Sequence, residues 1–365
     1  MQLEFFPSRV LTLYLARLFI TRILAVLVML VMVLQVLDLL GESGDILAHA
    51  GNGQAELWHY VTLRAPQLVA RFLPYSVLLA TIITLATLNQ NSEVIAMKAA
   101  GLSAHQVLAP LFLTAILVSL ASFAFNERVV TRATATLKAW SAVDYGPIPK
   151  SSGVRSSVYL RDGDNIISAT TITGEGADTV MEGVTWYRRD RQGNIVEQAR
   201  SPRATWNGDG WKLEQATRFD VNTAATAQAA SLVIAPELGP DEVAISGVDA
   251  DAQNLWKLSR SIDAMKAAGR RTAELEGKWW HKISGPLASA LMPLLGAVAA
   301  FGLARSGQLL VRAIAGMALG FAYFVIDNAA LALGNFGGYP PFLAAWAPFL
   351  LFLFVGEAVL IRTEE

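Results

Sequence analysis

The sequence contains no cysteine, and only 16% of its 365 residues are charged. The absence of cysteine excludes disulfide bonds, thiolate metal sites and thiol catalysis. Soluble domains carry roughly 25% charged residues. The shortage of charge, together with 53% hydrophobic residues, therefore indicates that lipid forms part of the solvent around this chain. The net charge of −1 provides no overall basic field, which argues against nucleic acid as a partner.

Motifs for catalysis and nucleotide binding are also missing. The sequence has no G-x4-G-K-[ST] loop, so this chain does not itself bind ATP through a P-loop, and it has no H-E-x-x-H or G-x-S-x-G motif. The histidines are scattered over loops and span ends, at His49, His59, His105 and His281. We therefore expect a non-catalytic protein with no metal site and no cofactor of its own.

Six apolar segments, three early and three late, are each close to the ~20 residues that a helix needs to cross a membrane. They cover about residues 11–37, 63–88, 107–125, 283–303, 309–333 and 342–361. The first segment lacks the small-residue cleavage site of a signal peptide, so we expect it to be retained, with Asp38 at its end. The sequence therefore predicts an α-helical membrane protein with six transmembrane helices.

The basic residues of the short loops predict the orientation. With the N-terminus in the cytoplasm, the inner side receives Arg9, Arg17, Arg22, Lys98, Arg305 and Arg362. The outer loops, residues 38–62 and 334–341, contain no lysine or arginine. This bias follows the positive-inside rule and predicts that both termini are cytoplasmic.

A long polar segment, residues 138–277, separates the two sets of apolar segments and is predicted to lie outside the cytoplasm. Short alternating stretches with turn signals are typical of antiparallel strands, and Asn207-Gly208-Asp209-Gly210 predicts a hairpin between Trp206 and Trp211. We expect an all-β domain, a sandwich or jelly roll, followed by a connecting helix from Leu255 to Gly269. The predicted domains are residues 1–137, with spans 1–3, residues 138–277, and residues 278–365, with spans 4–6.

Two pairs of basic residues border the outer ends of predicted spans. Arg64 and Arg71 are two helical turns apart, and Lys278 and Lys282 are one turn apart, so each pair shares a helix face. Such a cluster suits an anionic lipid headgroup, because arginine binds phosphate with two parallel hydrogen bonds. Snorkelling of these side chains to ordinary phospholipid explains them equally well from residue types alone.

Two acidic residues lie inside predicted spans, Asp327 in the fifth and Glu357 in the sixth. Ionisable groups in spans are costly and face an interior or a cavity. A proton relay is one interpretation, and bonding to a neighbouring span is the favoured one. The fifth span also contains a G-x-x-x-G pattern, Gly316 and Gly320, which permits close helix approach and suits a span that slides against a neighbour.

The cytoplasmic loop between the second and third spans predicts a short helix over about residues 91–101. Asn91 or Ser92 is suited to the N-cap, and Gly101 to the C-terminal stop. Such a helix across two span ends can dock a soluble partner, although a simple helix connection is the alternative. The candidate contact residues are Ser92, Glu93, Val94, Met97 and Lys98.

The order of several short motifs carries a family resemblance. They are Leu73-Pro74-Tyr75, the 91–101 segment, Ala244-Ile245-Ser246-Gly247, Trp279-Trp280-His281-Lys282-Ile283 with Pro286-Leu287, and Phe321-Ala322-Tyr323-Phe324-Val325-Ile326-Asp327-Asn328 followed by Pro340-Pro341. Together they resemble the lipopolysaccharide export permease family (LptF/LptG, also called YjgP/YjgQ), and the last motif is closer to the LptG branch. The resemblance spans essentially the whole chain.

The resemblance implies a six-span permease subunit of an ABC transporter in the inner membrane of a Gram-negative bacterium, with a β-jelly-roll in the periplasm. Such a subunit pairs with a paralogous, LptF-like permease on a cytoplasmic, LptB-like ATPase dimer, which uses the ATP. The complex extracts lipopolysaccharide from the inner membrane and passes it to LptC-like and LptA-like jelly-roll proteins, towards the outer membrane. Glu93 would engage the ATPase, and Gly316 and Gly320 would lie in a gate-forming span.

One position departs from the family pattern. Family members can carry a lysine near the outer end of the first span, where this chain has Gln35. We therefore expect a site for lipid or the gate at Gln35 and Asp38, with Arg64, Arg71, Lys278 and Lys282 supplying the positive charge. Two alternatives stay open: a proton-coupled carrier of an amphiphile that uses the acidic residues of the spans, and a non-transporting membrane anchor for a periplasmic partner.

Overall fold

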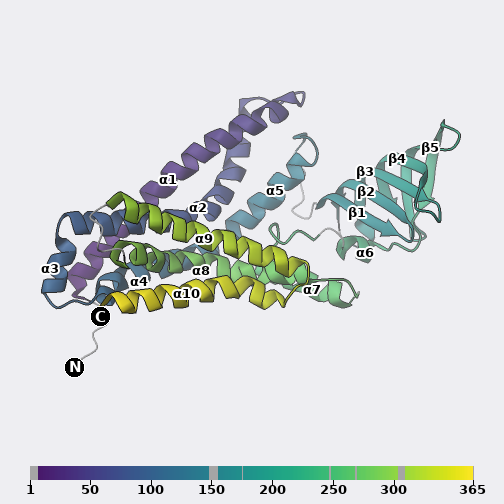
Figure 1. The fold of residues 1–365 in the computed structure, drawn as a ribbon. Coiled ribbons are helices and arrows are strands. Elements are labelled where there is room, and N and C mark those ends of the chain that lie inside the picture. The colour runs from purple at the N-terminus through teal and green to yellow at the C-terminus, as the bar shows by residue number, and fades with distance from the viewer. Residues whose placement is uncertain are drawn as a thin grey trace.

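The computed structural model describes residues 7–147, 155–174, 176–245, 248–267, 269–302 and 309–364. These residues form a bundle of long helices and one antiparallel β-sheet, which lies beyond one end of the bundle (Figure 1). The short helix α3 (Glu93–Ala99) and the C-terminal end of α10 lie at the opposite end of the bundle (Figure 1). Arg305, counted above in the inner loops, and the Ser246-Gly247 half of one family motif lie outside the described residues.

The bundle contains helices far longer than those of a typical soluble domain. The other helices are α1 (Arg9–Ala48), α2 (Gln54–Gln90), α4 (Ala104–Phe125), α5 (Thr131–Ser141), α6 (Pro240–Ile245), α7 (Leu255–Ala267), α8 (Ala273–Gly302), α9 (Leu309–Asn335) and α10 (Pro341–Glu364). Among the described residues, five helical stretches are long and apolar enough to cross a membrane: Arg9–Ala48, Gln54–Gln90, Ala104–Ser141, Ile314–Asn335 and Pro341–Arg362. A mostly helical fold with several apolar helices long enough to cross a membrane is therefore confirmed.

The segment predicted as the fourth span lies in α8, which is not among those five stretches of the described chain. Its apolar part begins after His281 and Lys282 and contains Pro286 and Pro293. Its position is nevertheless central, because α8 packs against α2, α4, α9 and α10. Leu291, Met292, Leu294 and Leu295 of α8 are at most 1% exposed.

Two helices extend well beyond their predicted ends. Helix α1 continues ten residues past Asp38, to Ala48, so Asp38 does not end this helix. Its carboxylate accepts hydrogen bonds from the side chains of α2 instead of capping α1. Helix α4 continues through a π-helical turn, η1 (Asn126–Val130), into α5, and the first strand begins only at Arg155.

The polar middle of the chain forms a single sheet of six antiparallel strands, which pair in chain order. The strands are β1 (Arg155–Asp162), β2 (Asn165–Thr173), β3 (Val180–Arg189), β4 (Ile195–Trp206), β5 (Trp211–Asp220) and β6 (Ala225–Ile234). The predicted hairpin is confirmed, because Trp206 and Trp211 are opposite each other at the start of the β4–β5 turn. The predicted connecting helix is α7, which ends at Ala267.

Trp211, the first residue of β5, belongs to the apolar cluster on one face of the sheet. Its side chain is fully buried, its indole Nε1–H donates to the carbonyl oxygen of Leu238 at 2.8 Å, and its ring contacts Trp206 edge-on. The Leu238 carbonyl precedes α6, which packs on the same apolar cluster through Val243. One tryptophan therefore fixes both the sheet core and the chain segment that leaves the sheet.

Replacing Trp211 with alanine is expected to destabilise the sheet by about 3–5 kcal/mol, because it removes a large buried side chain and leaves a carbonyl without its donor. Limited proteolysis of the full chain should show faster cleavage within residues 155–234. The matched control is Trp256→Ala, since Trp256 is 77% exposed on α7 and its loss should change stability by less than about 0.5 kcal/mol. Equal protease resistance of the two variants would contradict this role.

Candidate functional site

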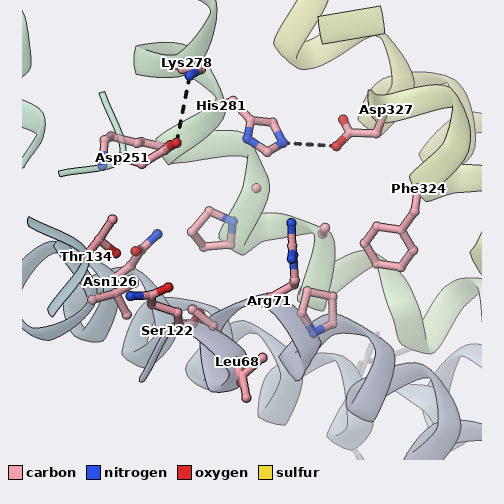
Figure 2. A pocket seen from close by; sticks show the side chains of 18 of the residues that line it. Leu68, Arg71, Ser122, Asn126, Thr134, Asp251, Lys278, His281, Phe324 and Asp327 are labelled. Atoms are coloured by element: carbon pink, nitrogen blue, oxygen red, sulfur yellow. Dashed lines mark hydrogen bonds and ion pairs between the residues drawn. The ribbon is translucent and has the colours of Figure 1, made fainter. Parts of the chain in front are cut away.

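A pocket of about 650 Å³ opens between α2, η1, α5, α8 and α9. Its walls carry the basic side chains of Arg64, Arg71, Lys138, Lys278 and Lys282. The four basic residues that the sequence places in two pairs therefore come together in one pocket, and Figure 2 shows Arg71 and Lys278 among the side chains that line it. They converge because each pair repeats at helical spacing, and because α2 and α8 pack face to face.

Arg64 is already paired with a carboxylate of this chain. Its Nη2 lies 2.8 Å and its Nε 3.0 Å from the two carboxylate oxygens of Asp38, a bidentate pair, and Nη1 donates to Gln67. The Tyr60 hydroxyl donates to the same carboxylate at 2.6 Å. Asp38 and Arg64 therefore fasten α1 to α2, and an anionic ligand would have to compete with Asp38 for Arg64.

Both predicted lysines also face carboxylates. The Lys278 Nζ lies 3.4 Å from Glu274 and 3.9 Å from Asp251 (Figure 2), and the Lys282 Nζ lies 3.7 Å from Glu127 of η1. The Lys282 side chain is only 9% exposed, whereas Lys278 is 35% exposed. A ligand can therefore reach Lys278 more readily than Lys282.

Arg71 differs from the other cations of the pocket. It is exposed, and among the described residues no carboxylate lies within ion-pair distance of its guanidinium. Figure 2 shows its side chain extending from α2 into the pocket. A guanidinium with free donors can bind a phosphate oxygen pair without first breaking an internal ion pair. Arg71 is consequently the strongest candidate for direct contact with an anionic ligand.

Gln35 is buried in α1 and does not line the pocket. Its side chain is 9% exposed, and neither its amide nitrogen nor its amide oxygen has a hydrogen-bond partner within the described part of the chain. An unpaired buried amide costs about 1–3 kcal/mol. Gln35 lies in the part of α1 between Leu27 and Asp38. Other side chains of this part, including those of Met32, Val36 and Leu37, are exposed.

Gly316 and Gly320 are buried on α9 and face this chain's own helices. A Cβ atom at Gly320 would lie 2.1 Å from Cδ2 of Leu78 on α2, so any side chain here would have to displace Leu78. One turn further along α9, the rings of Phe324 and Tyr75 stack at 3.9 Å. The G-x-x-x-G pattern thus allows close packing within the chain, and the opposite face of α9 is the exposed one.

Replacing Gly320 with leucine is expected to force α9 away from α2 and to lower stability by about 1–3 kcal/mol. The measurement is the thermal unfolding midpoint of the purified chain in detergent. Ala318→Leu is the matched control, because Ala318 lies on the exposed face of α9. A Gly320→Leu midpoint equal to that of the control would show that α2 and α9 tolerate separation.

The two acidic residues of the late spans each bond a histidine on a neighbouring helix. The Asp327 Oδ2 lies 3.0 Å from the His281 Nε2 of α8, and the Glu357 Oε1 lies 2.9 Å from the His105 Nε2 of α4. Bonding between spans, the favoured interpretation, is therefore confirmed. The sequence did not indicate the role of the histidines, because the pairs are 46 and 252 residues apart along the chain.

Helix α3 is the short helix predicted between the second and third spans. Ser92 stands at its N-terminus in the left-handed region (φ 59°), and its side chain makes no capping bond. Glu93 is half-buried and accepts hydrogen bonds from the Tyr14 hydroxyl at 3.1 Å and from the Asn91 amide at 3.2 Å. Tyr14 belongs to α1, so α3 contacts the first helix directly.

The apolar side chains of α3 are divided between its two faces. Val94 and Met97, predicted as partner contacts, are 5% and 8% exposed and belong to the core of the bundle. They anchor α3 instead of offering a docking surface, because they meet the ends of the long helices. Ile95, which was not among the predicted partner contacts, is 63% exposed and lies on the outer face with Lys98.

Long apolar helices joined to a separate antiparallel sheet define a multi-pass membrane protein with a large domain outside the bilayer. The chain belongs to the family described as "Lipopolysaccharide export system permease LptF/LptG", whose sequence model matches residues 13–362. It is 27% identical over 327 residues to the permease protein LptG of Escherichia coli, covering 87% of this chain and 89% of that protein. It is 24% identical over 324 residues to LptG of Haemophilus influenzae, covering 86% and 89%.

Proposed function

We propose that this chain is the LptG-type permease subunit of an ABC transporter that extracts lipopolysaccharide from the inner membrane. In this proposal it pairs with an LptF-like permease on an LptB-like ATPase dimer, and the ATPase alone binds and hydrolyses ATP. The lipid passes along the sheet domain to LptC-like and LptA-like jelly-roll proteins in the periplasm. Membership of the family supports this assignment, as do the names of its relatives.

The observation that carries the proposal is the basic pocket, in whose wall Arg71 has no carboxylate partner among the described residues. Lipopolysaccharide carries phosphates on a multiply acylated sugar, so its recognition needs cations at the level of the headgroups beside apolar helix surfaces. The pocket provides both, because Leu68, Pro74 and Phe324 line it with the cations. Helices α1 and α9 have the lowest buried share among the five candidate spans, at 22% each, which suits a lateral gate formed with a second permease.

The membrane topology is part of the same proposal. Counting α8 as a span gives six, and the short-loop arginines and lysines place both termini and α3 in the cytoplasm. The sheet then lies in the periplasm of a Gram-negative cell, where it receives the lipid. The arrangement in Figure 1, with α3 and the sheet at opposite ends of the bundle, supports this assignment.

Affinity purification of the tagged chain in mild detergent tests the proposal. We expect a second six-span permease and a P-loop ATPase to co-purify in fixed proportion, and bound lipopolysaccharide to be detected by mass spectrometry. The chain purified alone, under conditions that preserve other membrane complexes, would contradict the exporter assignment.

The proton-coupled alternative has its own test in Asp327→Asn combined with Glu357→Gln. A carrier driven by protons should lose transport when both groups are neutral. On our proposal the histidine–carboxylate pairs join helices, so transport driven by ATP should persist in this variant while thermal stability falls. A membrane anchor, in turn, should tolerate replacement of residues 91–101 by any short polar linker.

A further inference from the structure

The segment that joins the sheet to α8 is held against the bundle by ion pairs. Asp249 pairs with Lys138 of α5, and Asp251 lies 3.9 Å from Lys278 of α8. Both aspartates stand in the short connector, residues 248–254, that precedes α7. The connector therefore touches both halves of the membrane bundle at the point where the chain returns from the sheet.

A third contact fixes the start of α7. Glu127 stands in the π-helical turn η1, and its Oε2 accepts a hydrogen bond from the backbone N–H of Leu255 at 2.6 Å. Its Oε1 faces Lys282 at 3.7 Å, and the two side chains are 15% and 9% exposed. π-Helical turns occur frequently at functional sites, and this one directs a carboxylate at both a helix N-terminus and a buried lysine.

The same lysines form the wall of the basic pocket. Lys138, Lys278 and Lys282 line it, and Asp251 lines it as well. A phosphate that enters the pocket therefore meets cations that are already bound to connector carboxylates. Since phosphate monoesters carry about −1.5 to −2 charges at pH 7 and a carboxylate carries one, phosphate competes strongly for these lysines.

The three contacts of the connector differ in how easily a ligand phosphate can break them. The Lys138–Asp249 side chains are 50% and 30% exposed, and the Lys278–Asp251 side chains are 35% and 62% exposed. Exposed ion pairs are weak, whereas separating a buried pair leaves a charge without a partner. The two aspartate contacts can consequently open while Glu127 continues to hold the start of α7.

We infer that the connector is a phosphate-operated latch: phosphates of a ligand in the basic pocket displace Asp249 and Asp251 from Lys138 and Lys278, and this frees the sheet to move about the Glu127–Leu255 contact. The inference rests on the proposed function, because it takes a phosphorylated glycolipid as the ligand. It adds that ligand binding in the pocket changes the position of the sheet domain, because ligand phosphates replace Asp249 and Asp251 as partners of Lys138 and Lys278.

The absence of cysteine allows site-specific spin labels at Tyr159→Cys and Phe336→Cys. Tyr159 is 73% exposed on β1, and Phe336 is 89% exposed in the turn between α9 and α10. The distance between the labels is measured by double electron–electron resonance in the assembled complex in nanodiscs. Lipid A is the probe, and the same acylated disaccharide without its two phosphates is the control ligand.

We expect lipid A, but not the dephosphorylated form, to shift the distance distribution. The double variant Asp249→Asn/Asp251→Asn should show the shifted distribution without ligand and bind lipid A roughly threefold to tenfold more tightly, because two competing exposed ion pairs are gone. The matched control is Asp209→Asn in the exposed β4–β5 turn, which should behave as the unsubstituted chain. Each single aspartate variant should give part of the shift, which keeps the test available if the double variant is recovered poorly.

Binding of lipid A, measured separately at equilibrium, distinguishes failure of the latch from failure of the proposed function. Lipid A that binds without changing the label distance would overturn the latch and leave the exporter proposal intact. An unchanged ligand-free distance in the double variant would overturn it as well. Lipid A that fails to bind the assembled complex would contradict the proposed function itself.

Discussion

Glu93→Lys is expected to reduce lipopolysaccharide export at least about tenfold while leaving the chain folded. On the proposed function, the Glu93 carboxylate at the N-terminus of α3 is the anionic contact to the ATPase. Truncating one partner of a hydrogen-bonded charge pair at an interface costs about 2–5 kcal/mol, which exceeds the 1.4 kcal/mol of a tenfold effect. Within the chain the change is smaller, because a cation at a helix N-terminus costs only about 0.3–1 kcal/mol.

The measurement is ATP-driven lipid release from the complex in proteoliposomes, together with co-purification of the ATPase and the thermal unfolding midpoint. Asp209→Lys makes the same change in net charge at the exposed β4–β5 turn and should leave export unchanged. Tyr14→Phe removes the hydroxyl that bonds Glu93 but retains the anion, so it should retain ATPase binding. Undiminished export by Glu93→Lys would remove Glu93 from the coupling role.

Most of the fold could be predicted because its signals are local. Long apolar runs determine the helices, and turn sequences such as residues 207–210 determine the hairpins, so each element is encoded by neighbouring residues. The errors lie at helix ends. Asp38 was placed at the end of the first apolar segment, but α1 continues past it, and Tyr60 and Arg64 on α2 bond its carboxylate.

The candidate site could be predicted in composition but not in electrostatic detail. Helical spacing correctly grouped the basic residues of α2 and α8, because two residues on one face stay together whatever the tertiary fold. Their carboxylate partners come from distant parts of the chain, and Glu127, directly after the third apolar segment, was not selected. Its charge at the end of an apolar run was the available signal, since ionisable groups at such positions are costly without a partner.

The buried face of α3 also could not be assigned from the sequence alone. A helix with Val94 and Met97 on one side indicates an apolar face, but the pattern cannot say whether that face meets a partner or the chain's own bundle. The bundle ends provide a hydrophobic surface at that point, so the face is used internally. The outer face, with Ile95 and Lys98, is what remains for a partner in the proposed complex.

Arg71→Glu is expected to lower photocrosslinking of lipopolysaccharide to the pocket by about tenfold. Charge-assisted hydrogen bonds contribute about 1.5–3 kcal/mol, and 1.4 kcal/mol corresponds to a factor of ten in binding. The reversed charge also repels phosphate. The effect should exceed that of any other cation of the pocket, because Arg71 has no internal carboxylate to compensate for its loss among the described residues. A photoreactive amino acid in place of Ala70, which lines the pocket beside Arg71, reports the contact.

Two variants separate direct contact from a general effect of charge. Arg191→Glu makes the same charge change in the exposed β3–β4 turn and should leave crosslinking unchanged. Arg71→Lys keeps the charge but loses the paired donors of the guanidinium, so it should retain an intermediate level. Crosslinking that survives Arg71→Glu would mean that the arginine snorkels to ordinary phospholipid, and the ligand's phosphates would then have to bind the lysines that hold the connector. Loss in Arg71→Glu with recovery in Arg71→Lys would instead make this arginine the first contact of the headgroup, reached before the lysine–aspartate pairs are opened.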